Sequence, residues 1–368
     1  MPGRRPFRSV WRPWLSRLHA WAGLFLCLWL VMLGASGTLL AFRDDWVRLT
    51  VPASAGDLPA ATAEGLAVRA RAAAAALPGE VRLVRFATDR LPLDQVFLTD
   101  GGGALLDPRT GALLDRWEEN GRFMEWLFDL HHRLLLDDVG LKAIGFVGLA
   151  LVVMLVVGVV LASATWGQFK CRVWPKNPRR AALITAHRDL GLALALPLLL
   201  VAVTGVALTF PESSRAVAAW ASGPMPAVPP PPKPDAAAEP APIAWEAVFG
   251  AAWQRFPDAT IRFAIWPTAK NAAVELRLRQ PAEWHPNGRT TLRVDASGAV
   301  LATLDATTLP AGFQILNTAY PLHSGRVGGL AYRLAVALFG VGLVLLSGYG
   351  ALAYGRRLRG GGQRKALS

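Results

Sequence analysis

The chain has 368 residues, of which 53% are hydrophobic and 18% are charged, and its mean hydropathy is +0.32. This composition is too apolar for an ordinary soluble domain and too polar for a chain that lies wholly in lipid. The net charge of +13 would suit a nucleic-acid partner, but the basic residues cluster beside apolar segments, which excludes that function.

Four apolar runs are long enough to cross a bilayer core of about 30 Å, which requires about 20 helical residues. Between them lie two polar segments that are each large enough for a small folded domain. The predicted segments are a basic N-terminus (1–17), a first membrane helix (18–42), an exported domain (43–129), a second membrane helix (130–165), a cytoplasmic loop (166–186), a third membrane helix (187–210), a proline-rich linker (211–242), a second exported domain (243–322), a fourth membrane helix (323–354) and a basic tail (355–368).

Three clusters of arginine and lysine predict the orientation. They precede the first run, separate the second run from the third, and follow the fourth, so all three fall on one side of the four-helix topology. The positive-inside rule makes that side cytoplasmic, which places both termini inside and both long loops outside. Phe42-Arg-Asp-Asp follows the first run in place of a small-residue cleavage site, so we expect an uncleaved helix. Neither Cys27 nor Cys171 lies in an exported loop, so no disulfide framework is expected there.

Each exported loop predicts one helix followed by a small antiparallel sheet, because a helical segment is followed by short stretches in which apolar and polar residues alternate. The element order is the same in both loops, which indicates an internal duplication of helices and loops together. The predicted elements are a helix at 62–77 with strands at 81–86, 95–99, 104–106 and 112–117, and a helix at 243–256 with strands at 260–266, 273–279, 290–294 and 299–304.

Two of the apolar runs repeat each other at an offset of 168 residues. His19 begins one and His187 begins the other, and each is followed by a glycine four residues later and by a Ser-Gly or Thr-Gly pair that ends eighteen residues later. A histidine at the same depth of two membrane helices suggests that both bind one group, and haem iron is the best candidate. Gly23 and Gly191, one turn after the histidines, would leave room for a porphyrin edge.

Gly37 and Gly205, the glycines of the Ser-Gly and Thr-Gly pairs, are interpreted instead as close helix-packing positions.

The second and fourth membrane helices correspond less tightly. Each is preceded by histidine, His131 or His132 in one case and His323 in the other. Each ends in a glycine near the cytoplasmic face, Gly158 and Gly348, at spacings of 27 and 25 residues from His131 and His323.

The histidines therefore form an inner pair and an outer pair, at levels separated by roughly 20 Å, the rise of about 14 helical residues. Two bis-histidine haems across a bilayer need this arrangement. The sixth histidine, His285, falls in a turn of the second exported loop. Two alternatives stay open: the histidines are solvated residues at helix ends, or they bind a metal ion without porphyrin, with carboxylates such as Asp129 or Asp189 nearby. No dinucleotide-binding or P-loop motif is present, so the electron donor would be a quinol or a cytoplasmic reductase.

These residues resemble the PepSY-associated transmembrane family of bacterial inner-membrane proteins. The resemblance rests on the His-x-x-x-Gly…(Ser/Thr)-Gly helices at His19 and His187, and on Leu-His-x-x-Leu-Leu at His131. It rests also on the Asp-Pro-x-Thr-Gly turn at residues 107–111 and on Pro-Leu-His-Ser-Gly-Arg at residues 321–326.

The resemblance implies a four-helix transmembrane bundle with two periplasmic α+β PepSY-like domains, in the inner membrane. It implies two b-type haems with His19, His187, His131 and His323 as axial ligands, and His132 stays an alternative to His131. The expected activity is reduction of a periplasmic ferric siderophore or other Fe³⁺ chelate in iron acquisition, an oxidoreductase function whose acceptor-binding residues are unknown. The alternative function is a non-enzymatic, membrane-anchored binding or regulatory module.

Overall fold

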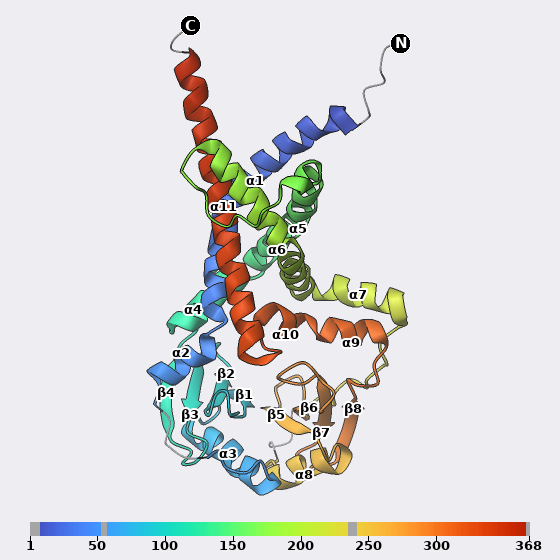
Figure 1. The fold of residues 1–368 in the computed structure, drawn as a ribbon. Helices are drawn as coiled ribbons and strands as arrows, with labels where there is room; N and C mark the ends of the chain where they lie inside the picture. The colour runs from blue at the N-terminus through green and yellow to red at the C-terminus, as the bar shows by residue number, and fades with distance from the viewer. Residues whose placement is uncertain (1–7, 53–56, 235–240, 366–368) are drawn as a thin grey trace. The chain divides into compact units, whose positions relative to one another are not determined.

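The computed structural model describes residues 8–52, 57–234 and 241–365. The chain divides into two compact units, and the sequence passes back and forth between them. The membrane unit contains the residues up to Ala41, Leu127–Pro211 and the residues from Leu322 onward, and the sheet unit contains Phe42–Trp126 and Glu212–Pro321. Figure 1 shows the order of the elements along the chain.

Four helical segments of the described chain are long and apolar enough to cross a membrane, as predicted. They are Trp11–Leu40 in α1 (Arg8–Leu40), Asp137–Gln168 in α5 (Asp137–Ala162) and the 3₁₀ turn η1 (Ser163–Gln168), Arg180–Thr209 in α6 (Arg180–Thr209), and Gly329–Arg359 in α11 (Gly329–Lys365).

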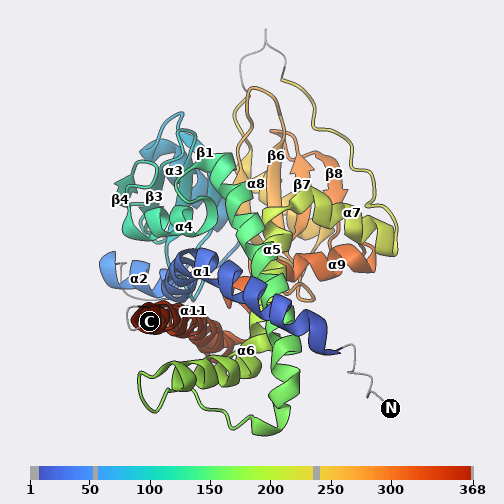
Figure 2. The ribbon, with the colours of Figure 1, turned by 90° about the horizontal axis from the view of Figure 1, so that it is seen from above.

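The membrane helices pack closely because small residues line their contacts. Helix α1 runs along α11, α5 runs along α6, and α11 also packs on α6 (Figures 1 and 2). At the crossing of α1 and α11, a Cβ atom on Gly34 would stand only 2.6 Å from the carbonyl oxygen of Gly340. Glycine at such a position lets the two backbones approach closely. In lipid no hydrophobic force drives helices together, so this close packing is what makes them associate.

The outer histidines lie in short helices that precede two of the membrane spans, not in the spans themselves. His131 lies in α4 (Phe123–Arg133) and His323 lies in α10 (Ala319–Ser324). Residues with positive φ interrupt the helical backbone after each short helix, and such residues cannot continue a right-handed helix. They are Leu134, Leu135 and Asp137 after α4, and Gly325, Gly328 and Gly329 after α10.

The strands of both loops form one antiparallel sheet with the order β4-β3-β2-β1-β5-β6-β7-β8. The prediction of two separate α+β domains is therefore corrected: β1 pairs with β5, with Leu83 opposite Ile265. Pairing these two strands satisfies backbone groups that would otherwise form two open sheet edges. The strands are β1 (Val81–Arg85), β2 (Asp94–Leu98), β3 (Gly103–Leu106), β4 (Leu113–Trp117), β5 (Thr260–Ile265), β6 (Val274–Arg279), β7 (Thr290–Val294) and β8 (Val300–Leu304).

Helices α3 (Ala63–Ala76) and α8 (Trp245–Arg255) lie side by side over one face of the sheet (Figure 1). Strand residues that face these helices, such as Val84 on β1 and Leu276 on β6, are fully buried. The period-two pattern is clear in β6 and β7, where buried residues alternate with less buried ones. Further helices of the sheet unit are α2 (Arg43–Thr50), α7 (Pro211–Ser222) and α9 (Ala311–Asn317).

Part of the segment predicted as a proline-rich linker is helical. Helix α7 occupies its first twelve residues, beginning at Pro211, and proline is favoured at the first position of a helix. Its Ala218 packs against Phe313 of α9, which buries an apolar contact that an extended linker would lack. Gly223, with a φ of 94°, ends the helix.

Candidate functional site

The four histidines of the membrane unit form two facing pairs. The ring centres of His19 on α1 and His187 on α6 lie 6.2 Å apart, with the ring planes at 78°. The ring centres of His131 on α4 and His323 on α10 lie 6.3 Å apart, at 55°. An imidazole nitrogen binds a transition-metal ion at about 2 Å, so two imidazoles on opposite sides of one ion hold their ring centres roughly 6 Å apart. Both pairs have this spacing.

Each histidine ring rests on a glycine of a neighbouring helix, at a point where a side chain would touch the ring. We call these glycines the seat glycines. The distances from the position of a Cβ atom on the glycine to Cε1 of the ring are 3.4 Å for Gly158 and His19, 3.5 Å for Gly350 and His187, 3.2 Å for Gly37 and His131, and 2.8 Å for Gly205 and His323.

Hydrogen bonds orient two of the rings. Nδ1–H of His187 donates to the carbonyl oxygen of Leu346 over 2.9 Å, and Nδ1–H of His323 donates to that of Val201, also over 2.9 Å. Each carbonyl belongs to the residue four positions before the seat glycine, so the missing side chain leaves it accessible. Because a carbonyl oxygen only accepts, the proton is on Nδ1, and Nε2 keeps the lone pair that a metal ion requires.

A hydroxyl group orients the third ring in the same way. Ser36 Oγ lies 2.7 Å from Nδ1 of His131 and donates its own proton to the carbonyl of Met32, also over 2.7 Å. In the arrangement in which Ser36 donates to Met32, its oxygen accepts from Nδ1–H of His131, which leaves Nε2 unprotonated. Thr204 repeats this arrangement more loosely, with its hydroxyl 3.5 Å from Nδ1 of His323.

The Ser-Gly and Thr-Gly pairs thus serve the outer histidines. The interpretation of Gly37 and Gly205 as helix-packing positions is corrected, because each faces an imidazole ring. The alignment of the helix-end glycines changes too. Gly350, and not Gly348, is the counterpart of Gly158, which makes both spacings 27 residues from the outer histidine. That equal spacing was the signal in the sequence that could have identified the seat.

The inner histidines line a cavity of about 490 Å³. This volume lies in the range of about 300–1,000 Å³ that is usual for cofactor sites. Two buried polar atoms in its lining, Nδ1 of His19 and Oγ of Ser347, have no hydrogen-bond partner among the described residues. The remaining lining includes four glycines and a group of arginines, namely Gly23, Gly158, Gly191, Gly350, Arg17, Arg180, Arg188 and Arg357.

The neighbouring His132 takes no part in the outer pair. Its ring stacks on Phe128 of the same helix, with the centres 5.3 Å apart and the planes at 22°. Residues 128 and 132 are one helical turn apart, so this contact is local. Of the two adjacent histidines, the structure brings His131 opposite His323.

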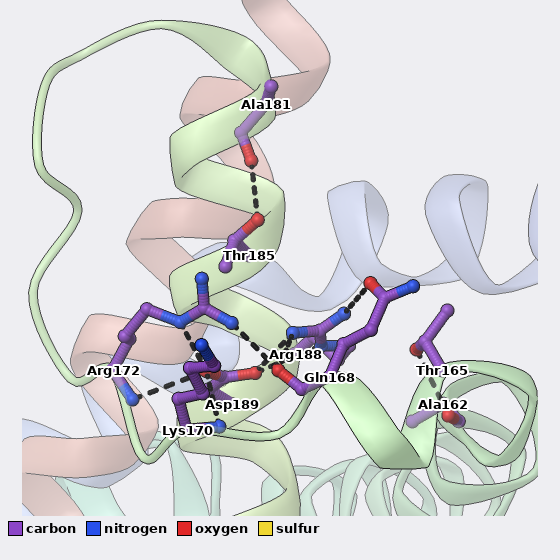
Figure 3. A network of polar contacts seen from close by, with 9 residues as sticks. All are labelled: Ala162, Thr165, Gln168, Lys170, Arg172, Ala181, Thr185, Arg188 and Asp189. Atoms are coloured by element: carbon purple, nitrogen blue, oxygen red, sulfur yellow. Dashed lines mark hydrogen bonds and ion pairs between the residues drawn. The ribbon is translucent and has the colours of Figure 1, made fainter.

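Asp189, two residues after His187, is fully buried and its carboxylate is surrounded by donors (Figure 3). It accepts hydrogen bonds from the backbone N–H of Lys170 and Arg172, both at 3.3 Å, and from the side chains of Arg172 and Arg188. These bonds tie the loop after η1 to the helix that carries His187. The carboxylate is thus engaged by cations and does not join a metal-binding group.

Among the residues that the structure describes, no group of three or more His, Cys, Asp or Glu side chains could hold a metal ion. The histidines meet only in pairs.

One family of known proteins matches most of the chain. The family described as the PepSY-associated TM region matches residues 16–357, a stretch that includes both histidine pairs and all four seat glycines. No curated protein matches the chain. Since the family match covers nearly the whole sequence, the chain belongs to the PepSY-associated transmembrane family of membrane proteins.

Proposed function

We propose that this protein is a di-haem b-type electron-transfer protein of the inner membrane that reduces a ferric siderophore, or another Fe³⁺ chelate, in the periplasm. The observation that carries the proposal is the pair of imidazole–imidazole distances, 6.2 and 6.3 Å. Each reduction adds one electron to Fe(III) and gives Fe(II), while a quinol or a cytoplasmic reductase is oxidised. The outer pair would be the level from which the chelate is reduced.

The residues present fit a haem at the inner pair. His19 and His187 would be its axial ligands, and the cavity of about 490 Å³ between them would receive the porphyrin. The glycines in the lining would leave room for the porphyrin, and Arg17, Arg180 and Arg357 would pair with the two propionates. When bound, haem supplies reversible one-electron transfer at iron.

The outer pair has the same design. Val201 and Ser36 hold Nδ1 of His323 and His131, so that Nε2 of each ring is available to iron. The pairing of histidines without further ligands favours haem over a bare metal ion, because porphyrin itself supplies the four equatorial nitrogens. A bare ion would need further protein ligands.

The proposed orientation places both termini in the cytoplasm and the sheet unit in the periplasm. The arginines that line the inner cavity support it, because Arg17, Arg180 and Arg357 belong to the three basic clusters of the sequence. An internal duplication is supported by the mirrored strand order on either side of the β1–β5 pair and by the matched seat glycines.

A second candidate function is a non-enzymatic membrane module that binds a peptide or chelate. A cavity of about 290 Å³ in the sheet unit favours it, since Trp284, His285, Thr307 and Asn317 line it with mixed aromatic and polar groups. In this case the histidines would be structural.

The deciding experiment is a reduced-minus-oxidised absorption spectrum of the purified full-length protein, with a haem count per chain. We expect a b-type α-band and two haems in the wild type, and one haem in each of His187→Ala and His323→Ala, with different α-bands. His132→Ala is the matched control and should keep both haems. Absence of reducible haem from the wild type would overturn the proposal and favour the binding module.

A further inference from the structure

The face of the sheet opposite α3 and α8 carries an arginine cluster, which consists of Arg277 and Arg289. On β6, Leu276 and Leu278 face the helices, so Arg277 between them points to the other face. Arg277 pairs with Phe263 on β5 and with Thr291 on β7, and its guanidinium lies over the Phe263 ring, 5.5 Å from the ring centre. Arg289 directly precedes the first residue of β7, and its charge interacts with that of Arg277.

The side chains of Arg277 and Arg289 have buried nitrogens without partners. Nε of each is buried and makes no hydrogen bond to any residue that the structure describes. Neither guanidinium is in an ion pair with a described carboxylate. A buried polar atom without a hydrogen-bond partner is costly, and a ligand that accepts hydrogen bonds would remove this cost at both side chains.

Other charged groups surround Arg289. Burial, and then the charges of Arg277 and of Arg215 on α7, lower the pKa of Arg289 to about 10, while Tyr320 and Glu283 act in the opposite direction. Glu283, the nearby carboxylate, is already committed. It accepts from the Thr290 hydroxyl at 2.8 Å, from the backbone N–H of Gln280 at 3.0 Å, and from the backbone N–H of Arg289.

We propose that Arg277 and Arg289 form the binding site for the carboxylate groups of an anionic Fe³⁺ chelate. This inference rests on the proposed function and names its substrate class. Guanidinium groups bind carboxylates through paired, charge-assisted hydrogen bonds, and partial burial strengthens such bonds. A neutral or cationic chelate would leave the cluster unpaired.

The position of the cluster in the chain suits an acceptor site. The phenol of Tyr320 contributes to the electrostatic environment of Arg289, and the Tyr320 ring stacks on buried His285 with the ring centres 4.9 Å apart. Tyr320 precedes His323 by three residues in the sequence, so a short stretch of chain joins the cluster to an outer histidine.

The test is binding of gallium(III) citrate to the full-length protein in detergent, measured by calorimetry. Gallium(III) forms chelates like those of Fe(III) but is not reduced under these conditions, so the result does not depend on haem or on electron transfer. We expect the wild type to bind the chelate. Arg277→Gln and Arg289→Gln should each bind it with an affinity at least about tenfold lower, since each loses a charged hydrogen-bond partner. Arg116→Gln, an exposed arginine of β4 that pairs with Glu80, is the matched control and should bind like the wild type.

Thermal unfolding separates binding from a structural role. Without ligand, Arg289→Gln should be at least as stable as the wild type, because it removes a repelled, unpartnered charge. Gallium citrate should raise the Tm of the wild type but not of this variant. A merely structural arginine predicts the reverse, a lower Tm without ligand.

Several outcomes overturn the inference. The wild type does not bind gallium citrate, or the wild type and both variants bind it with equal affinity. In the third outcome, the wild type binds the cationic gallium–desferrioxamine B chelate as tightly as gallium citrate. Arg277- and Arg289-dependent binding to phosphatidylglycerol vesicles without chelate binding would assign the cluster to lipid headgroups instead. If the wild type contains no haem but still binds the chelate, only the proposed electron transfer is overturned.

Discussion

The imidazole of His323 lies directly against the backbone of Gly205. A Cβ atom on that glycine would stand 2.8 Å from Cε1 and 3.2 Å from Nδ1 of the ring. Real Cβ atoms do not approach other atoms so closely, and His323 cannot retreat without losing its hydrogen bond to Val201. The glycine is therefore a condition for the position of the histidine.

Gly205→Ala should displace His323 and abolish haem binding at the outer pair while the inner pair keeps its haem. We expect the haem content to fall from two to one per chain, as measured by haem extraction and a difference spectrum. Gly348→Ala is the control, because a Cβ atom there meets nothing within 4 Å. Full haem content in Gly205→Ala would contradict the role assigned to this seat.

Gly350→Ala should be tolerated at the inner pair. Its Cβ atom would stand 3.5 Å from Cε1 of His187, which is ordinary van der Waals contact. We expect two haems per chain and an unchanged inner α-band. A larger side chain, in Gly350→Leu, should displace the ring of His187 and remove the inner haem. The two variants together show how large a side chain fits between residue 350 and this ring.

Asp94→Ala should strongly destabilise the sheet unit. The Asp94 carboxylate on β2 accepts hydrogen bonds from Arg69 of α3 and from the backbone N–H of Ala87, and both charged side chains are buried. Removing one partner of a buried pair leaves the other charge uncompensated, which costs about 3–5 kcal/mol. Denaturant unfolding, followed by tryptophan fluorescence, should show this loss. An effect under about 1 kcal/mol, the scale of an exposed ion pair, would contradict it.

Asp189→Asn should loosen the loop that follows η1. The neutral amide cannot pair with Arg172 and Arg188, and its NH₂ group cannot accept from the backbone N–H of Lys170. We expect severalfold faster tryptic cleavage after Lys170 and Arg172, measured by mass spectrometry. Thr185→Val, on the same helix but bonded only to Ala181, should leave cleavage unchanged.

The ion pair between Arg71 of α3 and Glu246 of α8 should make a small, pH-dependent contribution to stability. The hydrogen bond from Arg71 lowers the pKa of Glu246 below its ordinary value of 4.5. Folding thus favours the carboxylate, so the contribution is present above the unfolded-state pKa and is lost as the pH falls through the lower folded-state value. The Tm difference between wild type and Glu246→Gln should disappear between about pH 7 and about pH 3, and salt should reduce it, because both groups are exposed. A difference that persists at the acidic end would show another origin.

The local pattern of the chain was sufficient to predict most elements. The period-two alternation in residues 260–266 and 273–279 and the apolar length of residues 187–210 each arise from neighbours in sequence. The two strands are found there, and the helix is found with its start at Arg180, inside the segment predicted as a loop. The inner histidine pair was also found from sequence, because the repetition of His19 and His187 at an offset of 168 residues needs no contact information. Local periodicity could not show the breaks after α4 and α10, since those depend on positive φ at Leu134 and its neighbours.

The sequence by itself determined the four membrane helices, the strands, and the residue types that could bind a metal at two levels. Only the tertiary structure decided that β1 pairs with β5 in one sheet, that His131 and not His132 faces His323, and that Gly37, Gly158, Gly205 and Gly350 lie beneath the rings. Each of these facts joins residues far apart in the chain. The physical reason is that hydrophobic periodicity reports which face of an element is buried, but it does not report which distant element covers that face.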